Sequence, residues 1–141
     1  MKKVISMFAM VVLVAIVAKA QKAGGPVMTF EKTEIDYGNV VQSSDGVRMF
    51  KFKNTGTEPL VIKNAHGSCG CTVPKWPTEP IKPGQTAAIE VKYATDRLGA
   101  FNKTVTVETN EANPKHVITI KGNVYEKKFE AVMNHNTGNK R

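Results

Sequence analysis

An alternation of apolar and polar residues at every second position constrains the fold of this chain more than any other feature. Within Val47–Lys53, Phe50 and Phe52 alternate with Lys51 and Lys53. A period of two is typical of a β-strand with one buried face, whereas the buried face of a helix repeats about every 3.6 residues. No stretch after residue 20 has a convincing helical period, so we expect an all-β domain. Three further stretches alternate in the same way: Thr86–Tyr93, Phe101–Thr109 and Val117–Tyr125.

Turn-forming residues separate these stretches and mark the remaining strands. Val27–Phe30 and Ile35–Val41 are interpreted as one broken first strand, with a bulge or turn at Tyr37–Asn39. Pro59–Ile62 is interpreted as a short strand that leads into the cysteine stretch. About seven short strands with turns roughly every ten residues are typical of an immunoglobulin-like β-sandwich. The sequence predicts this fold for residues 27–125.

A proline cluster follows the cysteines. Pro74, Pro77, Pro80 and Pro83 lack the amide proton that a helix or a central strand requires. We therefore expect Val73–Ile81 to be an extended edge strand or a loop. An exposed edge is a place where another protein can add a strand, so the predicted partner is another protein bound through a sheet edge near these prolines.

The first twenty residues have the pattern of a secretory signal peptide. A positive start is followed by an uncharged run, and Ala18-Lys19-Ala20 has small residues at the positions that a signal peptidase reads. The run is shorter than the roughly 20 apolar residues of a membrane-spanning helix, so we expect cleavage before Gln21 and no membrane span afterwards. Residues 21–26 would then be a linker and residues 126–141 a disordered tail. The mature protein is expected to be periplasmic or extracellular.

The chain is basic. Removal of residues 1–20 takes away Lys2, Lys3 and Lys19 and no acid, so the formal charge falls from +8 to +5. We expect this excess to be spread over lysines of the strands, where it guards sheet edges against pairing with other molecules. No run of like charges is long enough to indicate a nucleic-acid or membrane surface, so no nucleic acid is predicted as a partner.

The two cysteines, Cys69 and Cys71, are the main candidates for chemistry. A disulfide across Gly70 requires a bend, because the Cα atoms of a bridge usually lie about 4.4–6.8 Å apart, and so small a ring would be strained and redox-labile. Alternatively, both thiolates and His66 could hold Cu(I) or Zn²⁺, although a closed zinc site would lack its fourth ligand. The third reading is structural: the pair would be either two reduced thiols that fill core space on one face of a strand, or a fixed bridge. The residues alone leave these three readings open.

Groups for acid–base catalysis are scarce. His116 opens the last predicted strand, where we expect a surface position, and His135 lies in the predicted tail. Only His66, three residues before Cys69, could form a nucleophile–base pair. The carboxylates are single and scattered, and no phosphate-binding loop leads into a helix. The sequence therefore predicts no enzyme, no catalytic residue, and no bound cofactor or metal.

Several motifs resemble a widespread family of secreted bacterial proteins. They are Asn54-Thr55-Gly56, Ser68-Cys69-Gly70-Cys71-Thr72, Pro83-Gly84 and Ile118-Thr119-Ile120-Lys121-Gly122. The family is known as domain of unknown function 1573, and the resemblance covers about residues 28–124. It implies an immunoglobulin-like sandwich similar to the major sperm protein and pilus-chaperone domains. It implies no catalytic residue, since the family has no established activity, and His66 is not part of its pattern.

These observations together predict an exported, non-enzymatic immunoglobulin-like domain that binds another protein. The alternative prediction is a thiol-redox or copper-binding protein that uses the Cys-Gly-Cys pair. The two predictions differ in where function lies. The first places it on the backbone of an edge strand, and the second on the sulfur atoms of Cys69 and Cys71.

Overall fold

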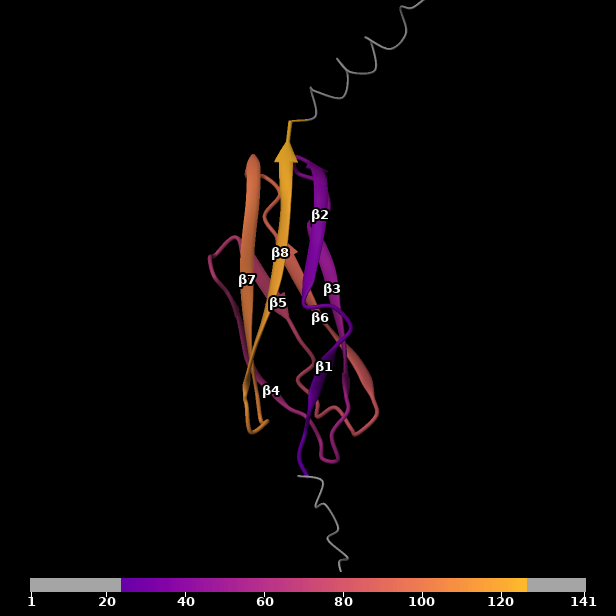
Figure 1. Ribbon diagram of the computed structural model, residues 1–141. Helices are drawn as coiled ribbons and strands as arrows, with labels where there is room; N and C mark the ends of the chain where they lie inside the picture. The colour runs from indigo at the N-terminus through magenta and orange to yellow at the C-terminus, as the bar shows by residue number, and fades with distance from the viewer. Residues whose placement is uncertain (1–23, 127–141) are drawn as a thin grey trace, which may run out of the picture.

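The structure is a computed structural model that describes residues 24–126 and forms two stacked β-sheets (Figure 1). The predicted signal peptide, the start of the predicted linker and the tail from residue 127 onward lie outside the described residues. The strands are β1 (Met28–Phe30), β2 (Glu34–Val41), β3 (Val47–Asn54), β4 (Ile62–Gly67), β5 (Thr72–Lys75), β6 (Thr86–Tyr93), β7 (Gly99–Thr109) and β8 (Lys115–Tyr125).

Each sheet has four strands. The first sheet has the order β1-β3-β6-β5, and the second has the order β2-β8-β7-β4. All neighbours are antiparallel except β2 and β8, which run parallel. The all-β sandwich confirms the predicted fold class, with eight strands in the described residues in place of about seven.

The core confirms the period-two pattern. Phe50 and Phe52 of β3 point inward and are almost completely buried, while Lys51 and Lys53 are exposed. Burying one such side chain stabilises a fold by about 1.5–3 kcal/mol, so the facing rows of the two sheets supply most of the cohesion. The other fully buried apolar side chains come from β6, β7, β8 and the segment before β4: Ile89, Val91, Val105, Val107, Ile118, Ile120 and Leu60.

The predicted broken first strand is present, and its two halves belong to different sheets. β1 pairs with β3, and after Glu31–Thr33 the chain continues as β2 beside β8. The register of β2 shifts between Asp36 and Asn39, where Gly38 has a φ of 64°. The Asp36 carboxylate accepts a hydrogen bond of 2.8 Å from the Gly38 amide. The predicted bulge is therefore confirmed, and glycine supplies the left-handed backbone that it requires.

The predicted short strand at Pro59–Ile62 is wrong in its boundaries. Leu60 makes an isolated bridge to Ile81, with backbone hydrogen bonds of 2.9 and 2.8 Å, and β4 only begins at Ile62. The difference arises because Leu60 pairs with the proline-rich segment, whereas Ile62 pairs with β7. The expected edge strand among the prolines is confirmed for Thr72–Lys75, which forms β5.

Asn54, at the end of β3, has a completely buried side chain. Its Nδ2 donates to the carbonyls of Glu58 and Ile81, both at 2.8 Å, and its Oδ1 accepts from the amides of Gly56 (3.0 Å) and Val27 (3.3 Å). Buried polar groups stabilise a fold only when every donor and acceptor is satisfied, as here. Asn54 therefore ties β1, the β3 turn and the Ile81 segment together.

We expect the substitution Asn54→Asp to destabilise the domain by about 3 kcal/mol or more, because a buried carboxyl replaces the amide that donates to two carbonyls. The free energy of unfolding in urea measures the effect. Asn110→Asp is the matched control, since Asn110 is exposed although it also accepts from one amide and donates to one carbonyl. A loss for Asn54→Asp no larger than for the control would contradict this role.

Candidate functional site

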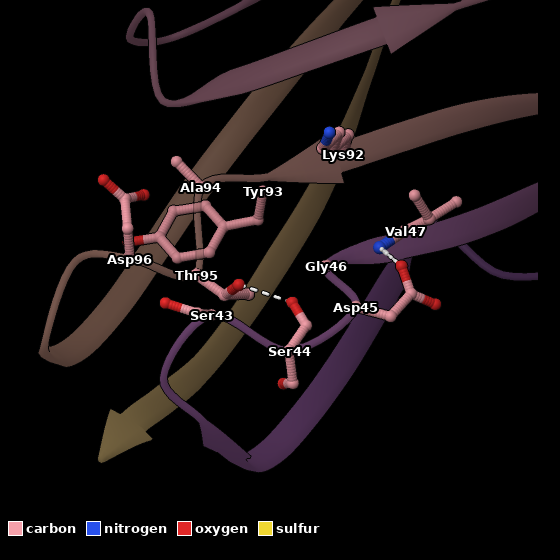
Figure 2. Close-up of a pocket in the computed structure, with 10 residues that line it drawn as sticks. All are labelled: Ser43, Ser44, Asp45, Gly46, Val47, Lys92, Tyr93, Ala94, Thr95 and Asp96. Carbon is pink, nitrogen blue, oxygen red and sulfur yellow. Dashed lines mark hydrogen bonds between the residues drawn. The ribbon is translucent and has the colours of Figure 1, made fainter. Parts of the chain in front are cut away.

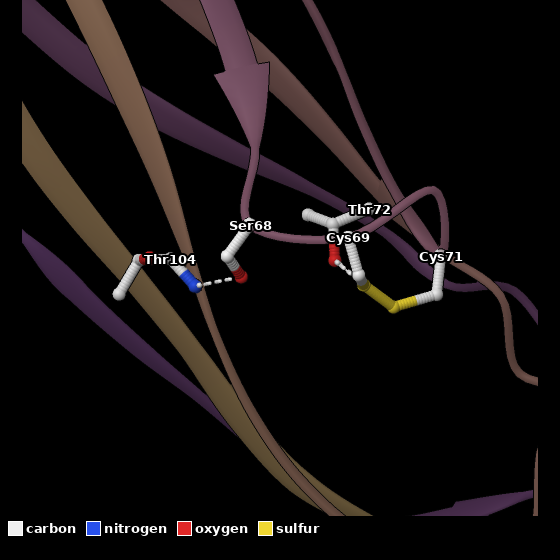
Figure 3. Close-up of a disulfide and its surroundings, with 5 residues drawn as sticks. All are labelled: Ser68, Cys69, Cys71, Thr72 and Thr104. Carbon is white, nitrogen blue, oxygen red and sulfur yellow. Dashed lines mark hydrogen bonds between the residues drawn. A yellow bond between two sulfur atoms is a disulfide. The ribbon is translucent and has the colours of Figure 1, made fainter.

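The two cysteines lie in the turn Ser68–Cys71, where the chain crosses from one sheet to the other (Figure 3). The turn follows β4 of the second sheet and precedes β5 of the first. Cys69 and Cys71 form a disulfide with a Cα–Cα distance of 5.2 Å. Cys71 is buried, with 4% of its surface exposed, whereas Cys69 is only partly buried against the core. The Thr72 hydroxyl lies 3.7 Å from the Cys69 sulfur and 3.8 Å from the Cys71 sulfur.

The structure contains a disulfide across Gly70, which agrees both with the redox-labile reading and with the structural reading as a fixed bridge. The reading as two free thiols on one face of a strand is wrong, because the cysteines occupy a turn. The side chain of His66 does not share the orientation of the cysteines. His66 is exposed on β4, whereas Cys69 packs against the core. Among residues 24–126, no three His, Cys, Asp or Glu side chains are grouped as a metal site would require.

Backbone contacts hold this turn on both sides of the bridge. The Ser68 amide donates to the Thr104 carbonyl (2.8 Å), and the Thr104 amide donates back to the Ser68 hydroxyl (3.2 Å). On the other side, the Ala94 amide donates to the Cys71 carbonyl (2.9 Å). Gly67 permits a close approach, since a Cβ atom there would lie within van der Waals overlap of the Thr72 carbonyl oxygen. The crossing is therefore fixed largely without the sulfur–sulfur bond.

The bridge closes a loop of only three residues, Cys69, Gly70 and Cys71. A loop-entropy estimate gives such a bridge only about 1.6 kcal/mol of stabilisation. We expect the double substitution of Cys69 and Cys71 by serine to lower the free energy of unfolding in urea by about 1–2 kcal/mol and to leave the domain folded.

Gly67→Ala is the contrasting variant, because its new methyl group meets backbone that cannot move aside cheaply. We expect it to cost more than the loss of both cysteines. Gly70→Ala is its control, since nothing lies within 4 Å of a Cβ atom at Gly70. If the double serine variant unfolded while Gly67→Ala stayed stable, the bridge would be the main support of the crossing.

A hollow of about 550 Å³ opens at the same end of the sandwich, between the β2–β3 turn and the chain after β6 (Figure 2). Some of its polar groups bond within the walls. The Asp45 carboxylate accepts from the Val47 amide (2.9 Å), and the Thr95 hydroxyl donates to the Ser44 carbonyl (2.5 Å). Groups that stabilise their own turns in this way are not available to polarise a substrate, so these two groups give no indication of an active site.

Tyr37 of β2 packs inside the sandwich at this end and contacts the β2–β3 turn. Its hydroxyl donates to the Gly46 carbonyl at 3.0 Å, and the Arg48 guanidinium lies 4.3 Å from the centre of its ring. Burial raises the pKa of Tyr37 to about 12, and the nearby Arg48 charge opposes this rise only in part. The neutral phenol is therefore the form that the folded state holds.

The raised pKa of Tyr37 predicts a loss of stability at high pH. Between about pH 10 and 12 the unfolded chain releases the Tyr37 proton while the folded domain keeps it, so the free energy of unfolding falls as pH rises through this window. Urea unfolding at several pH values measures the slope. Tyr37→Phe should show a shallower fall than the wild-type protein, and an equal slope in both would contradict the assignment.

A polar cluster that the sequence did not predict lies at the other end of the sandwich. Glu111, between β7 and β8, accepts from the Met28 amide and the Thr109 hydroxyl, both at 2.8 Å, and lies 2.6 Å from His116 Nε2. His116 also makes an edge contact with Phe30 at 6.0 Å. The predicted surface position of His116 is wrong, because the residue is in phase with the inward side chains of β8 and its side chain is 24% exposed. The placement of His116, Ile118 and Ile120 at every second position of the sequence could have predicted this inward orientation.

The described part of the chain carries almost no net charge. Residues 24–126 contain twelve Lys and Arg and eleven Asp and Glu, so their formal net charge is +1, compared with +8 for the whole chain. The strands themselves contain nine Lys and Arg and four Asp and Glu, a net charge of +5, as expected for lysines spread over the strands. The described residues outside the strands include three basic and seven acidic residues, which offset most of this charge.

Comparison with known proteins places the chain in a family. Residues 28–124 match the family described as protein of unknown function (DUF1573). The chain belongs to this family. The resemblance given by the Ser-Cys-Gly-Cys-Thr and turn motifs is thus confirmed over the expected range. A search of the curated proteins gives no match.

Solved structures share the fold at low sequence identity. A protein of unknown function from Porphyromonas gingivalis has a TM-score of 0.62 and 17% identity over 72% of this chain, which spans only 48% of that protein. The PapD-like domain 7 of human CEP192 has a TM-score of 0.56 and 10% identity, with 81% of this chain and 96% of that domain covered. The CupB2 chaperone of Pseudomonas aeruginosa has a TM-score of 0.50 and 10% identity, with 78% and 61% covered. These likenesses show the immunoglobulin-like fold alone.

Proposed function

We propose that this domain is an exported, non-enzymatic binding module that accepts an extended segment of another protein along the free edge of β2. The single observation that supports this site is that β2 is the longest of the four edge strands, with eight residues, while the edges of β1 and β5 are obstructed. Strand addition at such an edge provides affinity through main-chain hydrogen bonds. No helix among the described residues is long and apolar enough to cross a membrane.

The edge of β5, beside the prolines, is a poor acceptor of a strand, contrary to the sequence-based hypothesis. The Cys71 carbonyl accepts a hydrogen bond from the Ala94 amide, which follows β6. Because successive residues of a strand direct their backbone groups to opposite sides, Thr72 and Pro74 direct theirs to the free edge. The Thr72 amide already donates to the Cys69 carbonyl (3.2 Å), and Pro74 has no amide proton. This edge therefore offers no amide donor at either position.

The edge of β1 is obstructed in another way. β1 has three residues, and the amide of Met28, which would face an added strand, donates to Glu111. β4 has six residues, fewer than the eight of β2, and its last residue, Gly67, packs against Thr72. Short or covered edges are common devices against unwanted pairing.

The edge of β2 retains backbone groups for a partner. Thr33 bonds toward β8, so by alternation along the part of the strand before the bulge, Glu34 and Asp36 direct their amides and carbonyls away from the sheet. Both side chains are exposed and acidic. Glu34 also holds Lys121 in an ion pair of 2.6 Å, and this hydrogen bond raises the pKa of Lys121.

The charges on β2 favour one kind of partner. Pairing of two copies along this edge would bring Glu34 and Asp36 of one molecule opposite those of the other, which is unfavourable. An extended segment with lysine or arginine at alternate positions would instead place opposite charges together. We therefore propose a basic segment of another protein as the ligand.

A synthetic peptide of alternating lysine and valine tests this proposal. In the free protein, the amides of Glu34 and Asp36 should exchange with solvent deuterium quickly, and saturating peptide should slow their exchange about tenfold or more. The same peptide with alternate backbone amides methylated is the control, because it keeps the charges and loses the donors. Protection elsewhere in the domain, or none at all, would overturn the proposed edge.

Two variants at one position separate backbone pairing from charge. Glu34→Ala removes the carboxylate and keeps the amide, whereas Glu34→Pro removes both, and an outward-facing edge position tolerates proline. We expect Glu34→Pro to bind the peptide at least about tenfold more weakly than Glu34→Ala, provided that both variants unfold at the same urea concentration. Equal binding by the two variants would contradict strand addition.

A further inference from the structure

We propose that the Cys69–Cys71 disulfide is a thiol–disulfide exchange site that oxidises a dithiol of a partner protein, and that Thr72 and Lys103 stabilise the thiolate that the exchange releases. This inference is independent of the strand-accepting edge of β2. It concerns the opposite edges of the two sheets, where β4 and β5 lie.

The unequal burial of the two sulfurs sets the direction of attack. Cys69 is partly exposed, whereas Cys71 is buried behind it. An incoming thiolate therefore reaches the Cys69 sulfur, and Cys71 is the leaving group. Burial alone disfavours a thiolate, so an exchange site at this position needs groups that stabilise negative charge on the buried sulfur.

The Thr72 hydroxyl is the first such group. It lies within hydrogen-bonding distance of both sulfurs, at 3.7 and 3.8 Å, so it can donate to whichever sulfur carries the charge (Figure 3). Thr72 is itself buried at the start of β5, and its amide is fixed by the Cys69 carbonyl. The hydroxyl is therefore held in place before the bond breaks.

Lys103 of β7 is the second group. The pairing of β4 with β7 ends with Gly67 opposite Val105, and the turn residue Ser68 bonds to Thr104, so Lys103 is the next residue of β7 alongside the turn. Lys103 is in phase with the buried residues Phe101 and Val105 and is half-buried. A lysine side chain can keep its aliphatic stem on apolar surface while its ammonium group reaches the margin of that surface.

The charge of Lys103 is not taken up by an acid. Within the described part of the chain, the ion pairs involve Lys75, Lys115, Lys121 and His116, and Lys103 is not among them. In the proposed site, the unpaired ammonium group of Lys103 reaches the sulfurs, where a cation favours the thiolate form and so makes a sulfur a better leaving group.

The exchange balances without any further reactant. A partner thiolate attacks the Cys69 sulfur, a mixed disulfide forms, the Cys69–Cys71 bond breaks, and Cys71 leaves as a thiolate. The second partner thiolate attacks the partner's own sulfur in the mixed disulfide, and Cys69 leaves as a thiolate. Both cysteines take up the two protons that the partner thiols lost. The partner gains a disulfide, and this protein ends with two thiols.

The fold allows both redox states. The hydrogen bonds of Ser68 with Thr104 and of Ala94 with Cys71 do not involve sulfur, and the bridge closes only a three-residue loop. The reduced protein should therefore keep the same sandwich. A disulfide that the fold required for its stability could not be reduced and reoxidised without unfolding the domain.

Reduction of the folded protein by a small dithiol tests the proposal. The mature protein is incubated with millimolar dithiothreitol without denaturant, thiols are alkylated at intervals, and mass spectrometry counts them. We expect both cysteines to become alkylated while circular dichroism stays that of the folded domain. We also expect the reoxidised protein to convert a synthetic Cys-X-X-Cys peptide to its disulfide. A bridge that opens only after urea unfolds the domain would overturn the proposal and leave a structural disulfide.

Variants of the two supporting residues test their roles. Lys103→Met and Thr72→Val should slow reduction by roughly threefold to tenfold, since loss of a neighbouring charge or donor shifts a thiol pKa by about one unit. Lys103→Arg and Thr72→Ser should restore the rate. Lys63→Met, at an exposed position of β4, is the control and should react like the wild-type protein. Rates in Lys103→Met and Thr72→Val equal to the wild-type rate would overturn their assignment.

Discussion

A sandwich built from two four-stranded sheets has four edge strands, and the hydrogen-bonding groups along these edges must be paired, covered or left to water. The chain treats its edges differently. Proline removes the donor of β5, and a glutamate side chain covers the start of β1. Charge and a bulge modify β2 without covering it. The features on which strand addition depends therefore lie at the edges of the two sheets and not in the buried core.

The core and the fold class could be predicted from the sequence, because burial of one sheet face imposes its own period. The alternation of Phe50 and Phe52 with lysines is visible in seven residues and does not depend on the rest of the chain. The bulge at Gly38 could likewise be predicted, because glycine adopts a positive φ more readily than other residues. Predictions of this kind rest on local chemistry, and the structure confirms them.

Pairing between distant segments could not be predicted in the same way. Nothing local to residues 27–41 shows that β1 and β2 join different sheets, or that β2 runs parallel to the last strand. Glu111 and His116 lie only five residues apart, whereas the hydrogen bond from the Met28 amide to Glu111 joins segments that are 83 residues apart. The cysteine pair was identified as the site of interest. Its neighbours Thr72 and Lys103 depend on the register of β4 against β7, which the sequence does not display.

The parallel pairing of β2 with β8 has a mechanical consequence. The described chain enters the sandwich at one end, near β1, and leaves at the opposite end, beyond β8 (Figure 1). A pull on the two ends of the domain therefore draws β2 and β8 past each other along their length. The hydrogen bonds of that ladder would then bear the load together, in shear, whereas a hairpin pulled open at its ends loses its bonds one at a time. A domain connected in this way resists extension along its long axis.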